Sequence, residues 1–235
     1  MGAHASHAAE PVELSLPFNG PWRTQNSPAR RIPSHGSDLF AERYAVDFIA
    51  VDHRSRTAHR QDWRTLLATE PPTRFVGFGL PILAPRTGRV VAAHDGEPDH
   101  EARRSQLALI SYALGQAARI RQGVPAIAGN FVVIELAGGH AYVALVHLQK
   151  GSLRVGPGDC VREGQHLGAC GNSGNSTQPH LHIQAMDSPD LSVAEGLPMV
   201  FRRFRERPRG ARGFRERRLA VPGEGAVIEP AGTCS

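Results

Sequence analysis

The sequence predicts an all-β core that carries one partly helical insertion. Short apolar segments rich in β-branched residues recur along the chain, and glycine-containing turns separate them. Only one segment has the apolar spacing of a helix. At 235 residues the chain is long enough for one well-buried domain, or for one domain with a large insertion.

The composition argues against a membrane span and against a disulfide scaffold. No stretch of 18 or more apolar residues exists, so no transmembrane helix is expected. The three cysteines, Cys160, Cys170 and Cys234, are few and odd in number, and they imply no disulfide framework. Residues 1–34 lack the positive start and apolar block of a secretory signal. Three explanations stay open: this sequence starts after the signal, export uses another route, or the protein stays inside the cell.

The first strand is expected over Tyr44–Val51, which is rich in aromatic and β-branched residues. Asp47 lies inside this apolar run. A buried carboxylate is costly unless it is paired or bound to a metal, so Asp47 is a candidate functional residue.

A polar surface excursion is expected over residues 53–74, with Trp63 and Leu66–Leu67 as its apolar anchors. Residues 75–92 alternate polar and apolar residues and contain β-branched ones, which predicts two strands joined through Pro85–Gly88.

An insertion over about residues 94–128 then interrupts the series of strands. Pro98–Gly115 has helical character, with one possible apolar face formed by Leu107, Leu109, Ile110 and Leu114. Two interpretations stay open: the insertion forms a lid or rim of a groove, or an extra helix packs against the sheet.

Two further strands follow, over residues 130–136 and 141–148, and Gly138-Gly139 between them predicts a hairpin turn. The second of these strands carries His147. Gly156–Asp159 predicts another turn.

The stretch Gly171–Gln184 predicts a tight loop that leads into a strand. Its first part is rich in Gly, Asn and Ser, and His180–Gln184 then alternates polar and apolar residues. Residues i and i+2 of a strand share a face, so His180 and His182 would project side by side. Such a pair can bind zinc or be split between a ligand and an acid/base, although two surface histidines would give the same pattern. Eight other histidines are expected at the surface: His4, His7, His53, His59, His94, His100, His140 and His166.

The charge is concentrated near the C-terminus. Residues 201–218 hold nine arginines and two glutamates, a net charge of +7, whereas the whole chain carries +5. This run could meet an anionic polymer such as teichoic acid, a nucleic acid or a membrane surface. Alternatively it is the solvated edge of packed structure, which the apolar residues Met199, Phe201 and Phe204 favour.

The Gly171–Gln184 stretch, with Gly164–Gly168 before it, resembles the signature of the lysostaphin/LytM-type zinc endopeptidases, which cut peptide cross-links in bacterial peptidoglycan. Four other segments resemble the same family in the same order: Gly79–Val91, Gly129–Ile134, Ala144–Leu148 and Val155–Val161. The resemblance implies a LytM-like core of two antiparallel sheets in a barrel-sandwich hybrid, with the site in a groove on one face.

The resemblance also implies a division of the chain into three parts. Residues 35–200 would form the peptidase domain, with the insertion at about 94–128. Residues 1–34 would form an N-terminal extension, and the basic residues 201–235 would form a C-terminal extension packed on the domain.

The resemblance further implies a zinc cofactor and roles for five residues. Asp47 and His182 match two of the three metal ligands, and His147 and His180 match the two histidines that do not bind the metal. The family has a third ligand, a histidine four residues before the aspartate. Arg43 stands there in this chain, and His35 is the candidate that replaces it.

Three functions compete at this point. The favoured one is a zinc endopeptidase acting on peptidoglycan stem or bridge peptides, which would imply the cell envelope or secretion. The second is a non-catalytic binding or regulatory protein of the cell wall with a degenerate metal site, which Arg43 favours. The third is a phosphotransfer module, because sugar-transport phosphocarrier domains share the topology and use a histidine pair. No specific nucleic-acid partner is expected.

Overall fold

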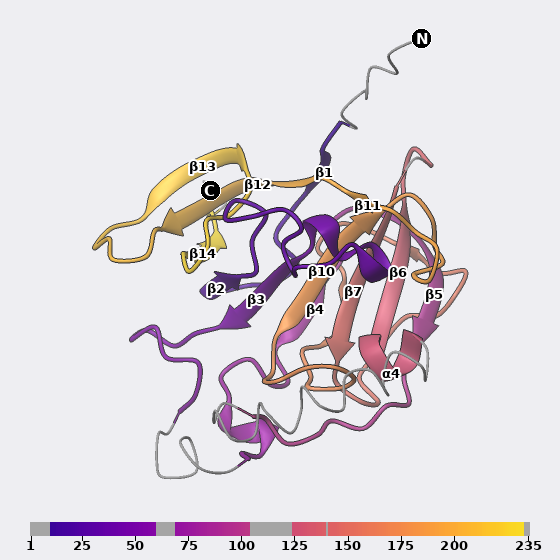
Figure 1. Ribbon diagram of the computed structural model, residues 1–235, viewed down its shortest axis with the longest axis horizontal. Helices are drawn as coiled ribbons and strands as arrows, with labels where there is room; N and C mark the ends of the chain where they lie inside the picture. Colours follow the sequence, from indigo (N-terminus) through magenta and orange to yellow (C-terminus); the bar gives the residue numbers. More distant parts are fainter. Residues whose placement is uncertain (1–9, 60–68, 104–123, 140, 233–235) are drawn as a thin grey trace.

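A computed structural model describes residues 10–59, 69–103, 124–139 and 141–232. Within these ranges the chain is mostly β, as predicted, and forms two sheets (Figure 1). The strands, in chain order, are β1 (Val12–Leu14), β2 (Trp22–Gln25), β3 (Val46–Ala50), β4 (Pro81–Leu83), β5 (Gly88–His94), β6 (Asn130–Leu136), β7 (Tyr142–Leu148), β8 (Cys160–Val161), β9 (His166–Ala169), β10 (Leu181–Met186), β11 (Gly196–Leu197), β12 (Met199–Arg207), β13 (Arg215–Ala220) and β14 (Val227–Pro230).

The larger sheet runs in the order β1-β12-β14-β2-β3-β10-β7-β6-β5-β8, with β11 beside β10 and β13 beside β12. The second sheet is the pair β4-β9. Adjacent strands are antiparallel except for β1 and β12, which are parallel. The strands that carry the expected site residues, β3, β10 and β7, are therefore neighbours at the centre of the larger sheet.

The core joins the two ends of the chain to the central strands. Trp22 of β2 stacks on Phe18, whose ring meets Phe48 of β3 edge-on at 5.1 Å. Phe48 in turn contacts Phe201 of β12. All four side chains are buried. Part of the expected N-terminal extension therefore belongs to the main sheet, because β1 and β2 are both paired within it.

Helical structure is short among the described residues. It comprises α4 (Val124–Ala128) and the 3-10 turns η1 (Leu39–Tyr44) and η2 (Pro72–Arg74). The strand expected from Tyr44 begins two residues later, because Tyr44 still belongs to η1. Most of the helix expected over Pro98–Gly115, and the anchors Trp63 and Leu66–Leu67, lie outside the described residues. No described helix is long and apolar enough to cross a membrane.

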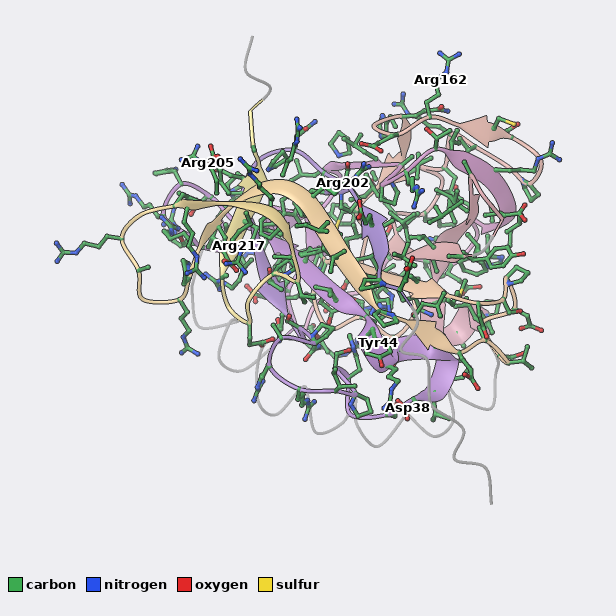
Figure 2. The ribbon with its side chains drawn as sticks, turned by 90° about the horizontal axis from the view of Figure 1, so that it is seen from above. Asp38, Tyr44, Arg162, Arg202, Arg205 and Arg217 are labelled. Carbon is green, nitrogen blue, oxygen red and sulfur yellow. The ribbon has the colours of Figure 1, made fainter. Side chains whose placement is uncertain are left out.

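The basic C-terminal run forms the hairpin of β12 and β13. Met199, Phe201 and Phe204 are buried on its inner face. Figure 2 shows Arg205 and Arg217 over the hairpin. Arg205 pairs with Glu229, and Arg217 pairs with Glu206. The run is thus a packed edge of the sheet, on which four of the nine arginines pair with a carboxylate of the described residues.

Candidate metal centre

Three of the five expected site residues converge on one point. One donor atom from each of His35, Asp47 and His182 lies within 4.8 Å of the other two. Asp47 Oδ2 is 3.2 Å from His35 Nε2, and Asp47 Oδ1 is 3.0 Å from His182 Nδ1. Asp47 and His182 are directly opposite each other on β3 and β10, so their side chains project from the same face of the sheet.

His35 reaches the cluster through the loop before η1. The Ser34 amide donates to the Arg43 carbonyl at 3.0 Å, which places residue 35 next to residue 43 in space. Gly36 then turns the chain with a φ of +88°, in the left-handed region that glycine tolerates best. His35 therefore occupies the neighbourhood of Arg43 although it lies eight positions earlier in the sequence.

Arg43 itself faces outward. Its Nη1 atom donates to Asp38 Oδ2 at 2.8 Å, and its guanidinium lies over the Tyr44 ring. Asp38 lies at the lower edge of the molecule in Figure 2. Asp38, and not Asp47, is therefore the carboxylate that Arg43 pairs with.

A hydroxyl fixes which nitrogen of His35 carries the proton. Ser34 Oγ donates to the Glu42 carbonyl at 3.0 Å, so it accepts from His35 Nδ1, which is also 3.0 Å away. With the proton on Nδ1, the lone pair of Nε2 faces Asp47. This is the tautomer in which an imidazole can bind a metal through Nε2.

The side-chain amide of Gln184 fixes the tautomer of His182, and here the proton lies on Nε2. Gln184 Nε2 donates to the Phe40 carbonyl at 2.7 Å, which leaves Gln184 Oε1 as an acceptor 2.9 Å from His182 Nε2. The His182 Nε2–H group donates to it, so Nδ1 is the nitrogen that can bind a metal. The two histidines thus aim different ring atoms at the same point.

His147 and His180 complete the cluster and have the same tautomer. His147 Nδ1 is 3.0 Å from the Ser173 carbonyl, and His180 Nδ1 is 2.8 Å from the Gln178 carbonyl. A carbonyl only accepts, so both Nδ1 atoms are protonated and both Nε2 atoms carry a lone pair. The two rings lie 4.8 Å apart, and His180 Nε2 is 3.6 Å from Asp47 Oδ1.

His147 has an unusual backbone. Its φ is +64°, and the register of β7 against β6 shifts between the pairs Asn130–Leu148 and Val132–Leu145. The register shift and positive φ mark a bulge, where the strand can redirect a side chain. A left-handed non-glycine residue costs of order 1–3 kcal/mol, and such strain is typical of functional sites.

Burial and mutual charge set the ionisation of the cluster. Burial alone would raise the pKa of Asp47, but electrostatic interaction with His35 and His180 and the hydrogen bond from His182 hold it well below the usual value. Burial lowers the pKa of His147 well below the ordinary value, and it also lowers that of His180. Burial would lower the pKa of His182 too, but its hydrogen bond and charge interaction with Asp47 raise it to about 9. Around the Asp47 carboxylate, His147 and His180 are therefore neutral imidazoles, and His182 holds a proton when no metal is bound.

The cluster opens into a groove of about 270 Å³. All five expected site residues line it. The remaining lining residues are Asn26, Ser37, Glu42, Ile127, Asn175 and Thr177. A groove open on one side gives an extended chain access to the buried donors.

Residues 75–192 match the family model described as "Peptidase family M23". The chain belongs to peptidase family M23. His147, His180 and His182 lie within the matched residues, whereas His35 and Asp47 precede them.

Several solved structures are similar to this chain, among them two catalytic domains. The catalytic domain of the antimicrobial peptidase lysostaphin from Staphylococcus simulans is 22% identical over 65% of this chain and 74% of that chain, with a TM-score of 0.37. A mutant of the catalytic domain of the prophage-encoded M23 protein EnpA from Enterococcus faecalis is 17% identical over 84% of this chain and 95% of that chain, with a TM-score of 0.38. No curated protein sequence matches the chain.

Sequence reasoning missed the residues that orient the cluster. Ser34 and Gln184 fix the two tautomers described above. Asn26 Nδ2 donates to Asp47 Oδ2 at 2.8 Å, and Ser176 Oγ lies 2.9 Å from His180 Nδ1. Gln184 was open to detection, because it follows His182 by two positions and so shares its face of the strand. The remaining three residues sit in loops and gave no periodic signal.

Proposed function

We propose that this M23 family member is a zinc-dependent endopeptidase in which His35, Asp47 and His182 hold the metal. The observation that carries the proposal is the match between the donor set and zinc. Two imidazoles and one carboxylate are ligands that hydrolytic zinc sites use, and such sites keep one position open for water or substrate. His35 presents Nε2 to the metal, because Ser34 holds its Nδ1. His182 presents Nδ1 once that atom has lost its proton, because Gln184 holds its Nε2.

The bound zinc would lower the pKa of a water molecule and polarise the carbonyl of the bond to be cut. His180 and His147 would act from beside it. Both are neutral and both aim Nε2 away from the carbonyl that holds Nδ1, so each can accept a proton or, once protonated, donate one. A protonated imidazole here would also stabilise negative charge developing on the substrate oxygen. The carbonyls of Ser173 and Gln178 keep the two rings oriented while the proton moves.

The substrate class proposed is the stem or bridge peptides of bacterial peptidoglycan. The support is the resemblance of Gly171–Gln184 and its neighbouring segments to the lysostaphin/LytM-type signature. The open groove is consistent with an extended peptide, which must lie along the sheet face to bring a bond to the buried donors. Activity on this substrate would place the protein at the cell envelope or outside the cell.

The non-catalytic alternative rests on Arg43 standing where the family has a ligand. The structure weakens this argument, because the loop of residues 33–36 brings His35 to the same neighbourhood. A degenerate site would also have no need for two further histidines with fixed tautomers.

The test is peptide release from purified peptidoglycan by zinc-loaded protein and by three variants. His147→Ala and His180→Ala should lower turnover by roughly 10²–10⁴-fold, the usual contribution of a general acid or base, while zinc content stays the same. His53→Ala, a change at an exposed histidine outside the groove, should leave both unchanged. If zinc-loaded wild-type protein released no peptide from several types of peptidoglycan, the endopeptidase hypothesis would be rejected in favour of the non-catalytic binding protein.

A further inference from the structure

Three arginines line a second groove on the sheet, of about 560 Å³. Arg23 comes from β2, and Arg207 and Arg209 come from the end of β12 and the turn after it. Ser55 stands between two of them. Arg23 Nη2 donates to the Ser55 carbonyl, and Arg207 Nη2 donates to Ser55 Oγ at 2.6 Å. The two guanidinium groups are therefore held in place beside each other.

The positive charge of this groove is not neutralised. Among the described residues, no carboxylate lies within 4.0 Å of Arg23, Arg207 or Arg209, although most other arginines of the hairpin have such a partner. One acidic residue, Glu224, lines the groove, and its carboxylate accepts from the Ser27 amide and faces Arg30. Burial, followed by the like charges of Arg209 and Arg207, lowers the pKa of Arg23. Packed like charges of this kind are costly unless an anion binds between them.

The arginine groove and the metal centre lie on the same face of the sheet. Gln25 is directly opposite Asp47 across β2 and β3, and Arg23 is directly opposite Ile49. Opposite residues project to the same side, and residues two apart on a strand also share a side. Arg23 precedes Gln25, the residue opposite Asp47, by two positions on β2, which is about 7 Å along the strand.

The two grooves are also adjacent at their lining. Gln25 lines the arginine groove, and its neighbour Asn26 lines the metal groove and donates to Asp47. A peptide extended along this face advances about 3.3–3.6 Å per residue. A side chain two or three residues from the bond at the metal would reach the arginines.

We propose that Arg23, Arg207 and Arg209 form a binding site for a carboxylate of an acidic peptide substrate. Guanidinium groups pair with carboxylates through two parallel hydrogen bonds, so this chemistry suits the site. The proposal rests on the peptidase function for the identity of its ligand, but binding itself needs neither metal nor turnover. All three arginines lie outside the residues that match the family model.

The experiment measures the binding of two short peptides to metal-free protein by isothermal titration calorimetry. The peptides are identical except that one carries Glu where the other carries Gln. The variants are Arg23→Gln and Arg209→Gln. Arg212→Gln is the matched control, because Arg212 is exposed in the same turn and its replacement removes the same charge. Free inorganic phosphate is titrated as a competing anion.

Wild-type protein should bind the Glu peptide about tenfold or more tightly than the Gln peptide, since hydrogen bonds between charged groups are the strong ones. Each of the two site variants should lose most of this preference, whereas Arg212→Gln should keep it. Equal binding of the two peptides, or an equal loss in the control, would overturn the proposal. Binding of phosphate through the same arginines without any preference for Glu would also overturn it, in favour of a phosphate-bearing polymer. Loss of peptidase activity alone leaves these outcomes unchanged, so the two proposals fail separately.

Discussion

Replacement of Gln184 by leucine tests whether the second partner of His182 prepares the metal site. Gln184 is 2% exposed, and its amide joins His182 Nε2 to the Phe40 carbonyl. Gln184→Leu removes both hydrogen bonds and leaves a buried donor and an acceptor without their partner. Each such group costs roughly 1–3 kcal/mol, so the free energy of unfolding should fall by a few kcal/mol. Loss of an outer partner of a ligand should also weaken zinc binding by roughly 10–100-fold.

The assay is competition for zinc against a chelator of known affinity, with urea unfolding of the metal-free protein in parallel. Gln184→Glu is the informative control. A glutamate can still accept from His182 Nε2–H but cannot donate to the Phe40 carbonyl. It should therefore lose stability while keeping most of the zinc affinity. Gln184→Leu protein that binds zinc as tightly as wild type would refute the claim that this amide fixes the tautomer.

Three further predictions follow from strain, ionisation and burial. The free energy of unfolding in urea should be about 1–2 kcal/mol higher for His147→Gly than for His147→Ala, because glycine accepts the positive φ and alanine does not. A glycine variant less stable than the alanine variant would contradict the bulge. Because the pKa of His182 in the metal-free protein is raised from 6.5 to about 9, its contribution to stability is complete below about pH 6.5 and is lost as the pH rises through 9. Zinc must displace that proton, so zinc affinity should rise about tenfold per pH unit between pH 7.5 and 9, and a flat profile would exclude this ionisation. Burial raises the pKa of the Cys170 thiol well above its ordinary value, so iodoacetamide should label the exposed Cys160 in native protein and reach Cys170 only after unfolding, as peptide mass spectrometry would show.

The central strands could be predicted because their signals are local. Alternation over His180–Gln184 and the apolar run around Asp47 both identified strands, and β10 and β3 lie where these patterns indicated. The same alternation placed His180 and His182 on one face. Pairing across strands then brought His182 level with Asp47, a consequence of register that only the folded chain reveals.

The rest of the site depends on contacts between segments far apart in sequence. The sequence offered His35 only as a candidate for the missing ligand, and the pairing of Ser34 with Arg43 that positions it has no sequence signature. The outward pairing of Arg43 with Asp38 was equally hidden. The arginine groove joins the two ends of the chain, and Arg23 gave no signal by itself because its partners lie about 180 positions later.

The most direct test of the account is the zinc content of purified protein measured by inductively coupled plasma mass spectrometry after loading at neutral pH. Wild-type protein and Arg43→Ala should each carry about one zinc per chain, since a structural or catalytic zinc needs at least three protein ligands and Arg43 provides none. His35→Ala should lose zinc as severely as Asp47→Ala. Wild-type protein that takes up no zinc, or His35→Ala protein that retains it fully, would contradict the assignment of His35, Asp47 and His182 as the metal site.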